Sequence, residues 1–320
     1  MAEDQKVPDS AKSDIRKVKA SLAEGLDGAL DYLIPKVEGQ SRHITRHAER
    51  LTKHDEQFLQ LARMEKQLKH LKGQCECLLK ADFAPDPWLA AAKDKHQGER
   101  CFLLGCGPSI ERTDLSKLAS EHTMGVNGIC LIENFQLEYF CTVAYNWWQS
   151  HEDAVRNYRC ARRFLPPYLP ELDSDSPTSW LNVLESNSYE APDKPAPWFF
   201  SKEADRLILN SGTVLFVCMQ LLYHLGFAEV ILLGADHDYG LSEEEKARGS
   251  FMLPIENVPD SHFRQDYFKP GEQIHFHWAA LERSYKLAHQ AYLADGRKII
   301  NASISTKLET FPRAKFDSLF

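Results

Sequence analysis

Residues 234–240, GlyAlaAspHisAspTyrGly, concentrate chemically active side chains directly after a strongly apolar run. Two carboxylates, a histidine and a tyrosine at the end of a buried run are costly unless they are paired or used. We therefore expect Asp236, Asp238 and Tyr239 to belong to a functional site.

A second segment, GlyCysGlyProSer at 105–109, also follows an apolar run. Its glycines allow a tight turn and a close approach of the backbone to a phosphate or sugar. Ser109 or Asp114 would start the following helix, whose N-terminus favours an anion. The segment lacks the third glycine of a dinucleotide fingerprint and the GlyLysSer/Thr of a P-loop. The alternative is a plain strand-to-helix turn.

Two further segments carry polar residues at the ends of apolar runs. Asn127 closes GlyValAsn, where an amide could read the edge of a base or sugar, or simply form a turn. AsnSerGlyThr at 210–213 opens a helix that Asn210 or Ser211 would cap. The free N–H groups of that helix would favour an anion, although capping alone would also explain the residues.

The elements that must position these segments alternate between short apolar strands and helices. The helix expected at 213–225 is apolar nearly all round, so it should be buried, and Gly226 should end it. The alternation predicts an α/β domain with a mostly parallel sheet. Ligands of such sheets bind beyond the carboxyl ends of the strands, where all four segments fall. The expected strands are 101–104, 124–127, 138–143, 229–234 and 298–301.

The N-terminal quarter of the chain has a different pattern. Residues 1–12 are polar and are expected to be disordered, and residues 13–81 show helical spacing. From Leu61 the apolar spacing is that of a heptad seam, which predicts a coiled coil and a homo-oligomer. A long helix docked on the main domain is the alternative. Residues 82–97 are expected to form a linker, followed by one domain over 98–320.

Composition excludes several classes. The 320 residues carry a formal net charge of −8, which argues against a nucleic-acid binder. The eight cysteines form no pair of CxxC motifs, as expected of reduced thiols in a cytoplasmic protein. The N-terminus is too polar for a signal peptide, and no apolar run approaches ~20 residues. Any membrane contact is expected to be peripheral, at the inner membrane.

The four segments, in this order, resemble two related groups of proteins. One is the Campylobacter-type sialyltransferases, which use CMP-sialic acid. The other is the family named after archaeal 6-hydroxymethylpterin pyrophosphokinase, with the Maf flagellin glycosyltransferases and bacterial proteins near polysaccharide gene clusters. The likeness covers about 98–320 and implies a Rossmann-like, GT-A-like fold. It is carried by LeuLeuGlyCysGlyProSerIle, ValAsn at 126–127, TyrAsn at 145–146, AsnSerGlyThr and IleLeuLeuGlyAlaAsp.

The resemblance also implies roles for individual residues. A histidine base should precede the last helix, where His275 and His277 stand with His262 upstream; we favour His277. The tyrosine that assists the departing phosphate corresponds to Asp238, with Tyr239 adjacent. The expected nucleotide-site residues are Gly105, Cys106, Gly107, Pro108, Ser109, Asn127, Asn146, Asn210, Ser211, Gly212 and Asp236.

We therefore expect an inverting transfer of a nonulosonic acid or Kdo-like sugar from a CMP-activated donor to a cell-surface glycan. A neutral histidine would take the acceptor's proton, and no cofactor is expected. One alternative is pyrophosphoryl transfer from ATP, with Mg²⁺ held by Asp236 and Asp238. Another is a non-enzymatic scaffold in polysaccharide biosynthesis. A zinc site of His275 and His277 with one of these aspartates is a third.

Overall fold

A computed structural model of the chain describes 85–167, 176–185, 198–247, 250–254, 262–264, 267 and 273–320. By its internal contacts the chain divides into two units, Met1–Phe83 and Ala84–Phe320. The predicted disorder at 1–12 and coiled coil at 13–81 lie outside the described residues and stay predictions. Within the described part, no helix is long and apolar enough to cross a membrane.

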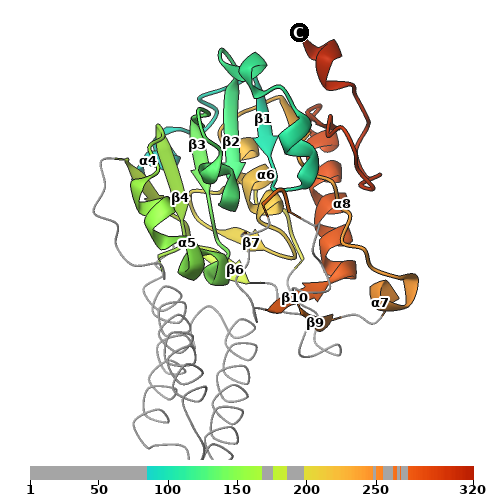
Figure 1. The fold of residues 1–320 in the computed structure, drawn as a ribbon. Helices are drawn as coiled ribbons and strands as arrows, with labels where there is room; N and C mark the ends of the chain where they lie inside the picture. The colour runs from blue at the N-terminus through green and yellow to red at the C-terminus, as the bar shows by residue number, and fades with distance from the viewer. Residues whose placement is uncertain are drawn as a thin grey trace, which may run out of the picture. The chain divides into compact units, whose positions relative to one another are not determined.

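A seven-stranded sheet forms the centre of the second unit, and each of its strand pairs is parallel (Figure 1). This confirms the predicted α/β class. The strand order is β11-β8-β1-β2-β3-β4-β5. The strands are β1 (Arg100–Leu104), β2 (His122–Val126), β3 (Tyr139–Cys141), β4 (Arg162–Leu165), β5 (Thr178–Trp180), β8 (Glu229–Leu233) and β11 (Lys298–Asn301).

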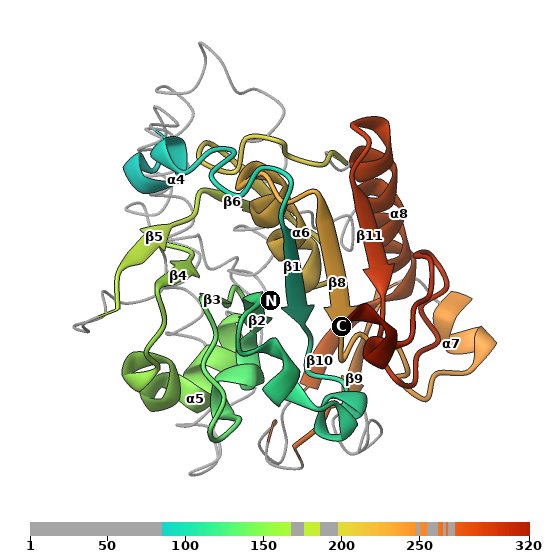
Figure 2. The same cartoon turned by 90° about the horizontal axis from the view of Figure 1, so that it is seen from above.

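The chain reverses its direction of travel across the sheet at β1. It runs outward from β1 to β5, then returns to add β8 and β11 on the other side of β1, as Figure 2 shows. Such a switch point leaves a crevice outside the carboxyl ends of the two strands concerned, here β1 and β8. A ligand is therefore expected at the carboxyl ends of β1 and β8.

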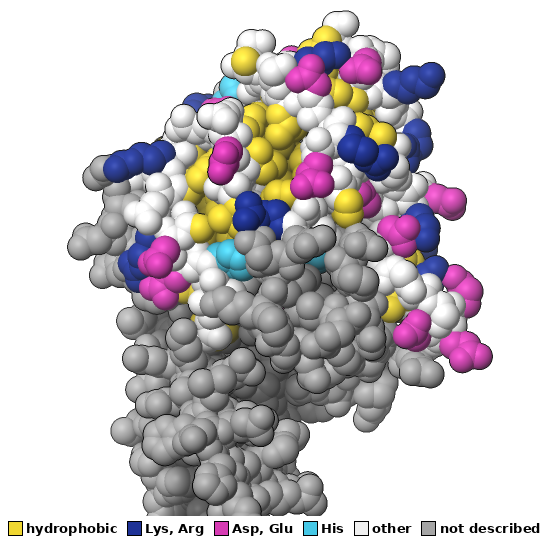
Figure 3. Space-filling view, in the orientation of Figure 1, with side chains coloured by type: hydrophobic (Ala, Val, Ile, Leu, Met, Phe, Trp, Pro, Cys, Tyr) yellow, Lys and Arg dark blue, Asp and Glu magenta, His cyan; other side chains and the backbone are white. Residues whose placement is uncertain are grey.

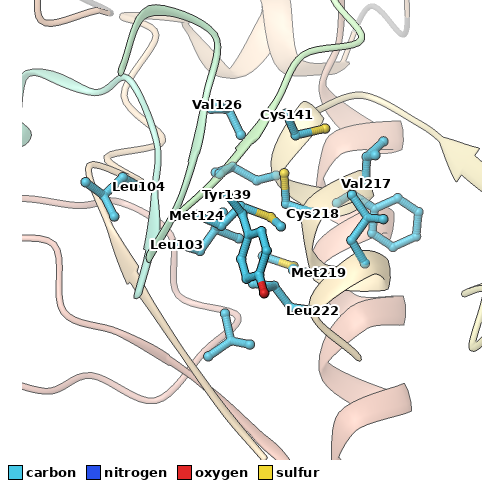
Figure 4. Packing of buried hydrophobic residues seen from close by; sticks show 14 of the residues in the cluster. Leu103, Leu104, Met124, Val126, Tyr139, Cys141, Val217, Cys218, Met219 and Leu222 are labelled. Atoms are coloured by element: carbon cyan, nitrogen blue, oxygen red, sulfur yellow. The ribbon is translucent and has the colours of Figure 1, made fainter. Parts of the chain in front are cut away.

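Helix α6 (Val214–His224) packs between the sheet and α8 (Trp278–Ala294). Figure 4 shows its side chains meeting those of the central strands. Contact on both sides explains why this helix is apolar nearly all round, as predicted. Gly226 has φ +99° and donates its N–H to the carbonyl of Tyr223, so it ends the helix as expected. The buried cluster includes Leu103, Met124, Tyr139, Val217, Cys218 and Leu222.

The cap of α6 differs from the prediction. Thr213, rather than Asn210 or Ser211, is the N-cap, and its hydroxyl accepts the N–H of Leu215 at 3.2 Å. Asn210 instead ends β7 (Ile208–Asn210), which pairs with β6 (Val183–Glu185). Gly212, at φ +71°, turns the chain between this strand and the helix. The helix therefore begins only after the turn at Gly212, and Thr213 is the first hydroxyl beyond that turn.

No α-helix follows β1, contrary to the expectation for the segment after the glycine loop. Two short 3-10 helices, η1 (Pro108–Arg112) and η2 (Leu115–Leu118), connect β1 to β2. Ser109 and Asp114 therefore start no long helix, although Asp114 caps η2. Figure 3 shows apolar side chains among charged ones on the described face of the domain seen in Figure 1.

Residues 86–97, placed in a linker by the sequence, are packed on the domain. Asp86 accepts the N–H of Leu89 at 2.8 Å and so caps α4 (Pro87–Ala91). Leu89 and His96 are both buried. The other described elements are α5 (Tyr145–Asn157), α7 (Glu243–Ala247), η3 (Asn127–Leu131), η5 (Phe316–Leu319) and the antiparallel pair β9 (Ser250–Pro254) and β10 (Gln273–His277).

Candidate functional site

A cavity of about 90 Å³ lies at the carboxyl ends of β1, β2 and β8. Its walls come from four chain segments, 105–107, 126–127, 213–215 and 234–239, together with three aromatic side chains. The predicted residues that it brings together are Gly105, Cys106, Gly107, Asn127, Asp236, Asp238 and Tyr239. Its walls also contain His237, His262, Tyr267 and Tyr285.

Two backbone hydrogen bonds hold the glycine loop against the loop after β8. Gly105 N–H donates to the carbonyl of Leu233, and Gly107 N–H donates to that of Gly234, each at 2.8 Å. A Cβ on Gly107 would stand 2.6 Å from Cγ of Asp236. The contact between the two loops therefore explains these glycines without a ligand.

Asp236 fills the place where the sequence suggests a phosphate. Its buried carboxylate accepts the N–H of Ser109 at 2.7 Å, and the Ser109 hydroxyl also donates to it. Burial raises the pKa of Asp236 above its ordinary value, against the lowering effect of these two hydrogen bonds. Since the protein's own carboxylate occupies the Ser109 donors, a bound phosphate would have to be stabilised elsewhere.

Asp238 and Tyr239 differ in their surroundings. Asp238 is exposed and accepts a hydrogen bond from Nζ of Lys307 at 2.8 Å, which holds the pKa of that carboxyl below its ordinary value. The lysine balances the negative charge of this carboxylate. Burial raises the pKa of Tyr239 to about 12, so its hydroxyl stays protonated and can donate a hydrogen bond.

His237 is the cavity residue best suited to accept a proton, and sequence reasoning did not select it. Its Nε2 lies 2.6 Å from Oε1 of Glu282 on α8. An ionised carboxylate only accepts hydrogen bonds, so Nε2 carries a proton, and in the neutral ring Nδ1 then holds a lone pair. This Nδ1 is buried and has no hydrogen-bond partner among the described residues. Burial lowers the pKa of His237, although Glu282 raises it, which favours the neutral ring.

The backbone and its aromatic neighbours fix the His237 ring. His237 has φ +56°, a left-handed conformation that is uncommon for a residue other than glycine. Its ring centroid lies 4.4 Å from that of Trp278, and the rings of Tyr239 and Tyr285 also surround it. Backbone strain of this kind is found preferentially at functional sites. The only sequence signal for His237 is its place in the acidic strand end.

The two histidines named as the base in the sequence belong to β10, which leads into α8. His277 is the N-cap of α8, where its Nδ1 accepts the N–H of Ala280 at 2.9 Å. In the neutral ring Nε2 then carries the proton, so His277 could serve as a base only by giving up the cap. His275 lies in β10, and its side chain is outside the described atoms. His277 is not among the described residues of the cavity wall.

His262, the upstream candidate, does lie in the cavity wall. Its ring is stacked on that of Tyr267, with 4.0 Å between the centroids. Burial lowers the pKa of His262 to about 3, so this ring is neutral at physiological pH.

Internal bonds hold Asn127 and Cys106. The Asn127 amide donates to the Tyr267 hydroxyl at 3.1 Å and accepts from Thr142 at 2.8 Å. The Cys106 thiol donates to the carbonyl of Val126, and burial raises its pKa to about 12. A neutral thiol is a poor nucleophile, so Cys106 contributes shape to the wall.

Asn210, Ser211, Gly212 and Pro108 are not among the described residues of the cavity wall. The Asn210 amide donates to the carboxylate of Glu185, and the Ser211 carbonyl accepts the Ser284 hydroxyl. A Cβ on Gly212 would approach the Leu281 backbone at 2.9 Å, so this glycine permits contact with α8. Pro108 begins η1, and Asn146 lies on α5, where only its backbone is described.

The N-terminus of α6 is the part of the cavity that favours an anion. Thr213, Val214 and Leu215 belong to the wall, and the helix has 11 residues. Backbone N–H groups and the helix dipole there stabilise negative charge. The described wall residues include no lysine or arginine.

A larger groove of about 890 Å³ lies beside η1 and η2. Its described walls combine apolar side chains such as Leu115, Leu118 and Phe135 with several glutamates, and they hold no histidine or cysteine. None of the predicted site residues belongs to it. We therefore place the candidate site in the smaller cavity.

The cavity and the switch point define a parallel α/β domain with a ligand site in the usual place for that fold class. No family model and no curated protein matches the chain. A solved structure of the sialyltransferase CstII from Campylobacter jejuni, in complex with a substrate analogue, cytidine-5′-monophosphate, is similar with a TM-score of 0.39 and 10% identity. The match covers 68% of this chain and 85% of that one. A likeness of this size carries no argument about reaction or residues.

Proposed function

We propose that the protein is a glycosyltransferase in which His237, oriented by Glu282, is the general base. The observation that carries the proposal is the buried Nδ1 of His237, which has no partner among the described residues, on a residue that lines the cavity at the switch point. A neutral imidazole whose other nitrogen is fixed by a carboxylate is the arrangement that general-base catalysis needs.

The reaction would proceed as a direct displacement. Nδ1 of His237 takes the proton of the acceptor hydroxyl while its oxygen forms a bond to the anomeric carbon of the donor sugar. The bond from that carbon to the phosphate oxygen breaks, and the electron pair leaves with the nucleoside monophosphate. Glu282 stabilises the imidazolium. The N-terminus of α6 and the Tyr239 hydroxyl stabilise the leaving phosphate.

The proposed donor is a CMP-linked sugar, such as a nonulosonic acid or a Kdo-like sugar. This choice follows the sequence resemblance, and the wall composition supports it, because a single phosphate can be stabilised by one helix N-terminus without cationic side chains. Binding sites for drug-sized ligands occupy roughly 300–1,000 Å³. The cavity of about 90 Å³ would therefore take the reacting groups, while the base and the glycan acceptor extend beyond it.

Magnesium-dependent pyrophosphoryl transfer receives less support from the same geometry. Asp236 is hydrogen-bonded to Ser109, and Asp238 is paired with Lys307, so the two carboxylates are engaged with different partners. An ATP site would also need to stabilise more negative charge than one helix terminus can.

A thermal-shift screen of the full chain with CMP, CDP, UDP, GDP and ATP, each with and without Mg²⁺, tests the proposal. A ligand that binds only the folded state raises the free energy of unfolding, by about 2.7 kcal/mol at a hundredfold excess over its Kd. The midpoint of thermal unfolding rises with it. We expect CMP to give the largest shift, independent of Mg²⁺. A shift with Mg²⁺ and ATP alone would support the pyrophosphokinase, and no shift with any nucleotide would support a scaffold.

The lowered pKa of His237 predicts the acidic limb of the pH profile. Burial and Lys246 lower this pKa from 6.5, while Glu282 and Asp238 raise it, and the aromatic rings of Tyr239 and Tyr285 lie beside the imidazole. The neutral base therefore persists below pH 6.5. We expect kcat/KM for sugar transfer to fall on acidification with a midpoint below pH 6.5. A midpoint above that value would contradict the assignment.

The same pKa shift contributes to stability. Because the folded pKa lies below the unfolded one, the neutral ring contributes stability above pH 6.5 that is lost as the pH falls through the folded pKa. Urea unfolding of wild type and His237→Gln between pH 5 and 8 would measure this contribution. The destabilisation of wild type relative to the variant should grow as the pH falls.

A further inference from the structure

A cluster of two histidines and a glutamate lies at the opposite edge of the sheet. His122 is the first residue of β2, and His96 and Glu99 precede β1. These residues lie at the amino-terminal ends of parallel strands, whereas the switch-point cavity lies at the carboxyl ends. One ligand atom from each of the three side chains lies within 4.8 Å of the other two.

The three ligand atoms lie close together. Oε2 of Glu99 lies 2.6 Å from Nδ1 of His96 and 3.1 Å from Nε2 of His122. In a tetrahedral zinc site with bonds of about 2.0–2.1 Å, neighbouring ligand atoms are about 3.3 Å apart. Glu99 is half exposed, so its carboxylate can retreat by the few tenths of an ångström that an ion would require.

Both histidines have a second partner on the far side of the ring. Nδ1 of His122 lies 2.5 Å from the carboxylate of Glu138, and Nε2 of His96 lies 2.8 Å from the Tyr139 hydroxyl. Histidines that bind metals usually donate their other N–H to a carboxylate or another oxygen, which fixes the tautomer. The Glu138–His122 pair leaves Nε2 of the neutral ring as a ligand directed at Glu99.

Packing holds the His96 ring in place. It stacks on Phe227 with 4.4 Å between the centroids and 10° between the planes. The backbone N–H of His96 donates to the carbonyl of Leu225 at 2.8 Å, and the backbone N–H of Glu99 donates to the carbonyl of His96 at 3.1 Å. Two of the ligands thus share one rigid segment, and the third belongs to the sheet.

Without an ion, the arrangement has a protonation requirement. His122 lies between two carboxylates, and it can donate to both only as the imidazolium cation. With an ion, the neutral ring donates to Glu138 and coordinates through Nε2. The two states can therefore be distinguished by direct measurement of metal binding.

We propose that His96, His122 and Glu99 bind a zinc ion, with water as the fourth ligand on the exposed side of Glu99. Two imidazoles and one carboxylate are a donor set that zinc accepts, whereas magnesium and calcium prefer sites made of oxygen alone. The ion would join the segment before β1 to the start of β2. The proposed zinc site does not depend on the proposed transferase reaction.

Zinc titration of the full chain, without an affinity tag and against a chromophoric chelator, tests the site. Histidines and cysteines in other parts of the chain can also bind zinc, so the measured quantity is the difference between variants. We expect Glu99→Gln and His122→Gln each to bind one zinc ion fewer than wild type. The control variant His289→Gln, on α8, should match wild type.

Glu138→Gln tests the second partner separately. This variant should keep the stoichiometry of wild type and bind zinc roughly 10–100-fold more weakly. Glu138 would orient the His122 ring through a hydrogen bond but would not itself coordinate the ion. Cobalt in place of zinc should give intense tetrahedral visible absorption bands in wild type that are absent in His122→Gln.

Stability provides an independent measurement. At a hundredfold excess of zinc over Kd, the unfolding midpoint of wild type should rise by roughly 5–10 °C, and that of Glu99→Gln should not. Equal midpoints in EDTA would establish that the variants are folded. Equal stoichiometry in wild type, Glu99→Gln and His122→Gln would overturn the zinc site, whatever the nucleotide screen shows.

Discussion

His237→Gln is expected to lower turnover with a CMP-linked donor by roughly 10²–10⁴-fold, the usual contribution of a general base. Glutamine approximates the shape of histidine, and its amide can still donate to Glu282, so the protein should keep its fold. It offers no nitrogen lone pair to accept the acceptor's proton. The measurement is the rate of sugar transfer or donor hydrolysis, with CMP binding followed by thermal shift.

His277→Asn is the comparison variant for this prediction. Asparagine is a favourable N-cap, so α8 should begin as it does in wild type. If His277 only caps the helix, as its bond to the Ala280 N–H indicates, the rate should stay close to that of wild type. Loss of activity in His277→Asn with activity retained in His237→Gln would refute the assignment of the base.

Gly234→Ala is expected to destabilise the domain by about 2–5 kcal/mol. Gly234 has φ +61°, which costs a residue with a side chain about 1–2 kcal/mol. An added Cβ would also overlap the carbonyl oxygen of Gly105, and overpacking of this kind costs about 1–3 kcal/mol more. Urea unfolding measures the loss. Nucleotide binding should weaken with it, because the loops after β1 and β8 must separate.

Gly240→Ala separates the two contributions to this loss. Gly240 has a similar φ of +64°, but a Cβ there would meet no atom within 4 Å. It should therefore cost only the backbone part, about 1–2 kcal/mol. The difference between the two variants reports the contact between the loops, and equal losses would mean that this contact contributes nothing.

The central sheet could be predicted because its strands are buried on both faces. Such strands appear in a sequence as continuous apolar runs, as at 101–104 and 229–234, and the structure places β1 and β8 there. The position of the cavity followed from the same reasoning, since the carboxyl ends of parallel strands share one edge. Gly105, Asp236 and Tyr239 accordingly line the same cavity.

The pairing of side chains within the site could not be predicted. Glu282 lies 45 positions from His237, and Asp236 lies 127 positions from Ser109, so neither partner is evident from local spacing. A glycine beside a phosphate and a glycine beside a carboxylate of the protein look alike in sequence. The short 3-10 helices after β1 likewise contain ordinary helix-forming residues, and tertiary contacts decide their geometry.

The position of β1 has a consequence for biosynthesis. Its partner β8 follows roughly 130 residues later in the chain, so at about 5–20 residues per second the ribosome needs roughly 6–26 s to supply it. During that interval the nascent sheet has an unpaired apolar edge, which can recruit foreign strands. Fragments that stop before β8 should accumulate as aggregates, and chaperone engagement should peak while this edge is open.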